Sequence, residues 1–195
     1  IGPIEHGVRK ATLVLNDGKV LALDTSRMTL KEIDGVTIHT NDQALVYVDS
    51  LDNKGVNLQN RLITPKGGEY TIMLADGTKV WVNAATEIRY PVKFAGKERR
   101  VRLEGEAYFE VAADPDRLFV VEGGGVVVKV HGTVFNMKAR EKQDHVDVSL
   151  LSGLVVVENH GVSRSLNPGE TAVCKKSVPS IETVSYTHLT LPTIL

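Results

Sequence analysis

An unbroken alternation of apolar and polar residues at positions 101–111 constrains the fold more than any other feature of this sequence. One side of the alternation carries Val101, Leu103, Gly105, Ala107, Phe109 and Val111, and the other side carries Arg102, Glu104, Glu106, Tyr108 and Glu110. Successive side chains of a strand point to opposite faces, whereas a helix repeats every 3.6 residues or so. The pattern therefore predicts a half-buried strand. Gly105 within it indicates a bend or the close approach of another backbone.

Short runs rich in Val, Ile, Leu, Thr and Tyr, separated by turn residues, continue this β pattern along the chain. Three pairs of runs are predicted to form hairpins, namely 70–74 with 79–83, 120–121 with 126–130, and 146–151 with 154–158. Asn167, Pro168 and Gly169 predict a further turn. The chain is thus predicted to be all-β and built from successive hairpins, either as a short-stranded β-solenoid-like winding or as a two-sheet sandwich.

One turn motif occurs twice. Residues 15–20 (LNDGKV) are similar to residues 74–80 (LADGTKV). In both copies an Asp-Gly pair supplies the positive φ that tight hairpins need. Two copies of a strand–turn–strand unit fit a repetitive β architecture, although Asp-Gly hairpins also recur by chance.

The bulk properties set limits on function. The 195 residues include 42% hydrophobic and 24% charged residues, which is ordinary for a soluble domain. A formal net charge of -1 gives no electrostatic reason to expect nucleic acid or an anionic membrane as partner. Cys174 is the only cysteine, so neither an intramolecular disulfide nor a cysteine-based metal site is expected.

The chain divides by pattern into three parts. Residues 1–60 form a β-rich lead segment that ends in a polar connector at 49–60, residues 61–176 hold the densest strand pattern, and residues 177–195 are a tail or the truncated start of a further domain. No run approaches the roughly 20 apolar residues that a membrane-spanning helix needs. Because the sequence begins at Ile1 without a signal-peptide pattern, we expect a fragment of a longer protein.

The candidate catalytic groups are weak. Glu104, Glu106 and Glu110 are expected to share one strand face, where neighbours at i and i+2 lie roughly 6.5–7 Å apart. That separation overlaps the spacing of the acid pair in inverting glycosidases. The favoured interpretation, however, is that these glutamates lie on the solvent-exposed face of a half-buried strand. The histidines are scattered without a ligand spacing, and they are His6, His39, His131, His145, His160 and His188.

The remaining singled-out residues also favour structural roles. Cys174 stands beside two lysines that could lower a thiol pKa, but a passive thiol is expected. Glycines 123–125 are not followed by the Lys-Ser/Thr pair of a phosphate loop, so they predict a turn. Trp81 is expected in the core or an interface. The basic run of Lys97, Arg99, Arg100 and Arg102 is interpreted as a solvated loop. We therefore expect no enzyme, no cofactor and no metal site, and no residue is nominated for partner binding.

A series of motifs in a fixed order resembles the FecR family over the central part of the chain. The matching segments are 64–70 (TPKGGEY), 74–84 (LADGTKVWVNA), 88–91 (IRYP) with Phe94, 103–111 (LEGEAYFEV) with Asp114 and Phe119, 131–137 (HGTVFNM), 151–157 (LSGLVVV) and 166–170 (LNPGE). His131 stands where the family usually has leucine. At residues 186–188 (YTH) the sequence departs from the family, whose members continue into a small α/β C-terminal domain.

The resemblance implies the periplasmic, signal-receiving part of a single-pass inner-membrane anti-sigma factor. A cytoplasmic part outside this chain would bind an extracytoplasmic-function (ECF) sigma factor. The periplasmic part would read the N-terminal signalling domain of an outer-membrane TonB-dependent transducer and so regulate iron-siderophore or glycan uptake genes. Two alternatives stay open, a carbohydrate-binding or glycan-processing β module and a passive structural or adhesive β-solenoid.

Overall fold

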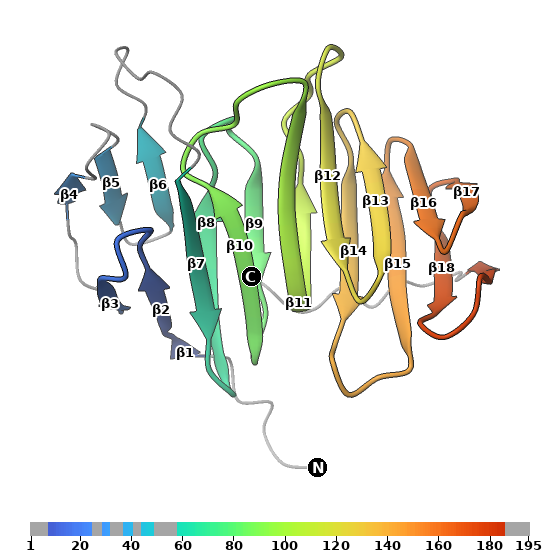
Figure 1. Ribbon diagram of the computed structural model, residues 1–195, viewed down its shortest axis with the longest axis horizontal. Helices are drawn as coiled ribbons and strands as arrows, with labels where there is room; N and C mark the ends of the chain where they lie inside the picture. The colour runs from blue at the N-terminus through green and yellow to red at the C-terminus, as the bar shows by residue number, and fades with distance from the viewer. Residues whose placement is uncertain (1–7, 25–28, 32–36, 41–43, 49–57, 186–195) are drawn as a thin grey trace.

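The computed structural model describes residues 8–24, 29–31, 37–40, 44–48 and 58–185. Within these ranges the chain forms strands and no helix, which confirms the all-β prediction (Figure 1). The strands are β1 (Val8–Arg9), β2 (Ala11–Val14), β3 (Val20–Leu23), β4 (Thr29–Lys31), β5 (Thr37–Thr40), β6 (Leu45–Val48), β7 (Gln59–Thr64), β8 (Gly68–Met73), β9 (Lys79–Val82), β10 (Thr86–Pro91), β11 (Glu98–Glu110), β12 (Leu118–Gly123), β13 (Val126–Val130), β14 (Val134–Ala139), β15 (His145–Ser152), β16 (Val155–Asn159), β17 (Val162–Leu166), β18 (Glu170–Lys175) and β19 (Ile181–Ser185).

Strand pairing arranges these elements in two layers. The first layer runs β3–β2–β7–β10–β11–β12–β13–β16–β17. The second layer runs β4–β5–β6–β8–β9–β11–β14–β15–β18–β19. Most neighbours are antiparallel, whereas β11–β12, β6–β8 and the short β1–β8 pair are parallel. Of the two predicted architectures, the sandwich therefore describes the layering, with β11 shared by both layers.

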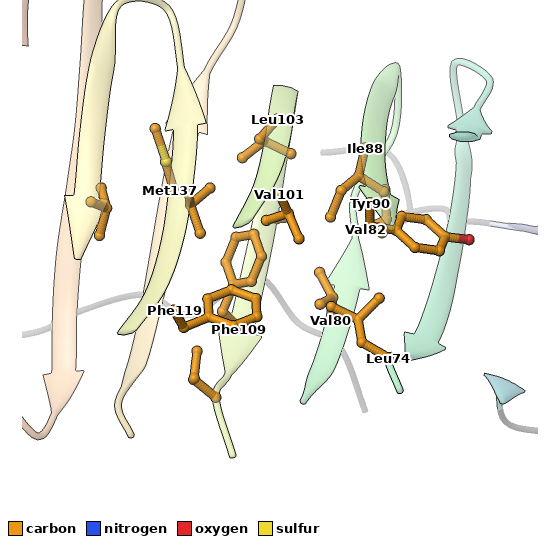
Figure 2. Close-up of a cluster of buried hydrophobic side chains, with 14 of the residues drawn as sticks. Leu74, Val80, Val82, Ile88, Tyr90, Val101, Leu103, Phe109, Phe119 and Met137 are labelled. Carbon is orange, nitrogen blue, oxygen red and sulfur yellow. The ribbon is translucent and has the colours of Figure 1, made fainter. Parts of the chain in front are cut away.

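The core lies between the two layers, because each strand turns its alternate side chains inward. Figure 2 shows apolar side chains from β9, β10, β11, β12 and β14 meeting there. Aromatic contacts cross from one layer to the other. The ring centroids of Phe109 and Phe119 lie 6.3 Å apart, and those of Tyr47 and Tyr90 lie 5.6 Å apart. Burial of such aromatic area is a main source of stability in a fold of this kind.

Strand β11 confirms the predicted alternation and also explains Gly105. Residues 98–104 pair within the first layer, and Gly105–Glu110 pair within the second. Gly105 adopts φ +120° at the crossing point, and a Cβ atom there would lie 2.3 Å from Thr86 Oγ1 and 2.7 Å from Thr86 Cα. The glycine is therefore required both by its backbone conformation and by the close approach of β10.

Two of the three predicted hairpins form, namely β8–β9 and β12–β13. The third prediction is wrong, because β15 and β16 lie in opposite layers. Strand β15 pairs with β14 and β18, whereas β16 pairs with β13 and β17. The connection through Gly153 crosses between layers, and Thr133 Oγ1 donates a hydrogen bond to the Leu154 carbonyl oxygen at 2.9 Å. Alternation places a residue inside or outside, but it does not identify the neighbouring strand.

The repeated Asp-Gly motif forms two turns with the same hydrogen bonds. Leu15 N donates to Lys19 O and Leu74 N donates to Thr78 O, each at 2.9 Å. The aspartate of each turn also accepts a backbone hydrogen bond from the residue two positions later, at 2.9 Å for Asp17 and 3.0 Å for Asp76. The first turn joins β2 to β3 in the first layer, and the second joins β8 to β9 in the second layer.

The end of the chain differs from the sequence interpretation in one element. Residues 181–185 form β19, which pairs antiparallel with β18, although no strand is predicted after position 176. Gln59 and Asn60, the last residues of the expected connector at 49–60, belong instead to β7. The rest of that segment at 49–57, the interpretation of 186–195 as an unpaired tail, and His6 and His188 lie outside the described residues. No helix within the described ranges has the length and apolar character needed to cross a membrane.

Asn159, which the sequence analysis does not single out, holds the turn between β18 and β19. Its buried side chain donates from Nδ2 to the carbonyl oxygens of Lys175 (2.9 Å), Val178 (3.2 Å) and Ser180 (2.9 Å). We expect Asn159→Ala to lower the free energy of unfolding by about 2–3 kcal/mol, because it removes three part-buried hydrogen bonds to backbone carbonyl groups. Urea denaturation would measure the change. Asn159→Asp keeps the shape of the side chain but lacks the amide donors, so it should be destabilised as well. Wild-type stability in both variants would contradict this role.

Candidate functional site

The basic run at positions 97–102 is not the solvated loop that the sequence analysis expects. All of its residues from Glu98 onward belong to β11, and the side chain of Arg99 is 0% exposed. The reason is that the period-two pattern continues backward from Val101, so position 99 also points inward. A buried guanidinium is tolerated only where charge and hydrogen bonds compensate it.

That compensation comes from three segments of the chain. Arg99 Nη1 donates to Asp76 Oδ2 at 2.9 Å and to the Ala112 carbonyl oxygen at 2.8 Å. Its Nη2 donates to the carbonyl oxygens of Arg117 at 2.8 Å and His131 at 3.3 Å. The arginine thereby fixes the β8–β9 turn and the connections that lead into β12 and β14. Its role is structural.

The outer face of the first layer carries a cluster of charged side chains. We call it the charged face, and it consists of Arg61, Glu87, Arg89, Arg100, Arg102, Glu104 and Glu122. Glu87 pairs with Arg89 at 2.5 Å and with Arg61 at 3.7 Å, and Glu122 pairs with Arg102 at 3.2 Å and with Arg100. Glu87 and Glu122 are thus each shared by two arginines.

Two open depressions adjoin on this face. One, of about 360 Å³, lies where β11 leaves the first layer, between β10 and the glycine turn at 123–125. The other, of about 260 Å³, lies between that region and the β2–β3 turn. Arg89 lines both depressions. The glycines at 123–125, predicted to be a turn, do connect β12 to β13 and also form one wall of the larger depression.

The three glutamates of β11 do not share one face, which corrects the sequence interpretation. Glu104 lies on the first layer opposite Glu87, whereas Glu106 and Glu110 lie on the second layer opposite Lys138 and Val134. The strand changes layer between Glu104 and Glu106, so their side chains lie on opposite outer faces of the sandwich. The spacing of a glycosidase acid pair is therefore not present between these two residues.

Trp81 lies on the outer face of the second layer rather than in the core. It is partly exposed and packs edge-on against Tyr108, with ring centroids 5.3 Å apart. On the same face, Glu106 accepts a hydrogen bond from Arg140 Nη2 at 3.0 Å and one from Asn136 Nδ2 at 3.4 Å. This combination of aromatic and polar side chains is a second candidate interaction surface.

The described histidines have separate protein partners. The ring nitrogens of His131 and His160 contact the carbonyl oxygens of Asp114 and Lys176, and His145 contacts the Asp144 carboxylate at 2.7 Å. Within the described ranges, no three side chains of His, Cys, Asp or Glu are grouped so that they could hold a metal ion.

Cys174 is buried on the inner side of β18. Burial, followed by the charge of Asp147, raises the pKa of the thiol to about 11. We therefore expect iodoacetamide to label Cys174 much more slowly in the native chain than in urea. The raised pKa contributes stability below the unfolded pKa near 9.0, and this contribution is lost as the pH rises toward 11. Stability relative to Cys174→Ala should fall over that window, and rapid native labelling would contradict burial.

The fold and its surfaces define a two-layer, all-β domain with one charged and one aromatic outer face. Residues 60–156 match the model of a family described as FecR protein. This part of the chain belongs to the FecR family, as its motifs predict. A comparison with curated proteins gave no match.

Two crystal structures are similar to the chain, each of a candidate anti-sigma factor from Parabacteroides distasonis ATCC 8503. The structure at 2.50 Å resolution has a TM-score of 0.63 and 32% identity, covering 65% of this chain and 60% of that one. The structure at 1.65 Å resolution has a TM-score of 0.62 and 33% identity, covering 64% of this chain and 59% of that one. The chain thus spans about three fifths of the proteins it resembles.

Proposed function

We propose that this chain is the signal-receiving part of an anti-sigma factor and that it acts by binding a protein partner rather than by catalysis. The observation that carries the proposal is the FecR match at residues 60–156, together with 32% and 33% identity to two candidate anti-sigma factors of the same fold. The two layers of the sandwich each present an outer surface on which a partner could bind.

The proposal in its finer form places this domain in the periplasm, on an inner-membrane protein with a single membrane-spanning segment. The partner on this side is the signalling domain of an outer-membrane TonB-dependent transducer. The ECF sigma factor is bound by a cytoplasmic part outside this chain, and the outcome is control of nutrient uptake genes. Any such coupling requires that the transducer bind two states of the receptor with different affinity.

An exposed sheet edge offers one means of docking. Strand β17 pairs with β16 on one side, and within the described residues it has no ladder partner on the other. Four of its five residues are exposed. Free backbone groups on such an edge can accept a strand from a partner.

Isothermal titration with the signalling domain of a TonB-dependent transducer from the same organism would test the proposal. We expect saturable binding with a single stoichiometry. A parallel titration with oligosaccharides addresses the carbohydrate-binding alternative, for which the partly exposed Trp81–Tyr108 pair is the natural platform. Saturable sugar binding without signalling-domain binding would overturn the proposed function.

A further inference from the structure

Three arginines lie directly opposite one another across neighbouring strands of the charged face. Arg61 on β7 is in register with Arg89 on β10, and Arg89 is in register with Arg102 on β11. Opposite residues in antiparallel strands have Cα atoms roughly 4.5–5.5 Å apart. Like charges directly opposite destabilise a sheet, so folding alone does not account for this arginine row.

The arginine row keeps unused hydrogen-bond donors. Arg89 and Arg102 each contact a carboxylate through Nε, at 2.5 Å to Glu87 and 3.2 Å to Glu122. Their Nη nitrogens have no hydrogen-bond partner among the described residues. The side chains are 51% and 69% exposed, and Arg89 lines both depressions. A guanidinium with free Nη groups is suited to bind a carboxylate with two parallel hydrogen bonds.

A row of opposite charge lies two residues further along the same strands. Glu87 stands opposite Glu104, and Glu104 has no ion-pair partner among the described residues. Residues at i and i+2 of a strand are roughly 6.5–7 Å apart on one face. An extended ligand lying along β10 and β11 would therefore meet the arginines with one side chain and the glutamates with the side chain two positions away.

We propose that the charged face binds an extended peptide segment of the protein partner, in which an acidic residue and a basic residue are two positions apart. The acidic side chain binds Arg89 and Arg102, and the basic side chain binds Glu104. A uniformly anionic polymer or membrane fits less well, because Glu87, Glu104 and Glu122 stand among the arginines and would repel it. The inference rests on the proposed function, since it names the surface that receives the partner.

The test uses fluorescence anisotropy with a labelled valine–threonine peptide that carries Glu-x-Lys, and titration with the transducer signalling domain. Arg102→Gln and Arg89→Gln are each expected to weaken binding of both probes about tenfold, the loss of one charged hydrogen bond. Binding by the wild-type chain should weaken with added salt. Lys129→Gln, on the same outer face but paired with Glu158, is the matched control and should bind like the wild type.

Thermal melting distinguishes a binding role from a structural one. Arg89→Gln removes a charge from between two like charges but also removes the exposed ion pair with Glu87, so its melting temperature should stay close to that of the wild type. A clear loss of melting temperature together with unchanged affinity would overturn the proposal. So would saturable binding of polygalacturonate or phosphatidylglycerol vesicles without binding of the peptide.

The outcomes separate the two proposals. If the signalling domain binds the wild type and both arginine variants equally, the arginine row is not the binding surface and the proposed function stands. If the signalling domain does not bind at all but the Glu-x-Lys peptide binds in a manner that depends on Arg102, the charged face is a peptide site and the proposed function fails.

Discussion

Replacement of Arg99 by leucine is expected to lower the free energy of unfolding by about 3–5 kcal/mol, the range for breaking one side of a buried ion pair. The substitution leaves the Asp76 carboxylate, 5% exposed, without its cation, and it removes the side-chain donor from three carbonyl groups, of which that of His131 keeps a second donor, Asp114 N at 2.9 Å. The total free energy of unfolding of a typical domain is about 5–15 kcal/mol. Urea denaturation followed by the fluorescence of Trp81, the single tryptophan, would measure the effect.

The two Asp-Gly turns supply an internal control for this prediction. Asp17 and Asp76 each accept the same backbone hydrogen bond, but only Asp76 also binds Arg99. Asp17→Ala should cost about 1 kcal/mol, the value of a single hydrogen bond, and Asp76→Ala several times more. A loss below about 1 kcal/mol in Arg99→Leu would show that the arginine is dispensable.

Gly105→Ala is expected to destabilise the chain by about 2–6 kcal/mol. Roughly 1–3 kcal/mol comes from an unfavourable backbone conformation and about as much from overpacking. The added Cβ would meet Thr86 on three atoms between 2.3 and 2.7 Å, including its backbone Cα. Since Thr86 Oγ1 also accepts a hydrogen bond from Glu106 N at 2.9 Å, the clash falls at the crossing between layers.

Gly125→Ala separates the two causes. Gly125 has φ +84°, but a Cβ atom there would have no neighbour within 4 Å. Its substitution should cost about 1–2 kcal/mol through backbone conformation alone. If denaturation shows that both variants lose the same free energy of unfolding, the close approach of Thr86 contributes nothing to the destabilisation of Gly105→Ala. A Gly105→Ala chain that does not fold at all, beside a folded Gly125→Ala chain, agrees with the prediction.

Local pattern predicted much of the fold, because inward and outward positions follow directly from alternation. The strand at 101–111 and the hairpins β8–β9 and β12–β13 were recognisable for this reason. The separation of β15 from β16 was not recognisable, since it depends on one non-neighbouring partner of each strand, β18 for β15 and β13 for β16. Arg99 was assigned to a solvated loop because the run is rich in charged residues. The period-two pattern of β11, continued backward from Val101, already placed position 99 on the inner side.

The charged face was only partly visible in the sequence. The polar positions of β11 were predicted, but the arginine row depends on the register between β7, β10 and β11, which a single strand does not encode. Arg61 and Arg89 each read as an ordinary outward residue. The division of Glu104 from Glu106 likewise required knowing that the strand changes layer at Gly105.

Because β11 pairs in both layers, its length is fixed more strictly than that of any connecting loop. Deleting or inserting a single residue near Gly105 would turn every side chain beyond it to the opposite side. Phe109 would then face water and Tyr108 would face the core, while the part of β11 in the first layer would keep its side chains in place. Related genes should therefore tolerate gaps in their turns but preserve the spacing from Glu98 to Glu110 residue for residue.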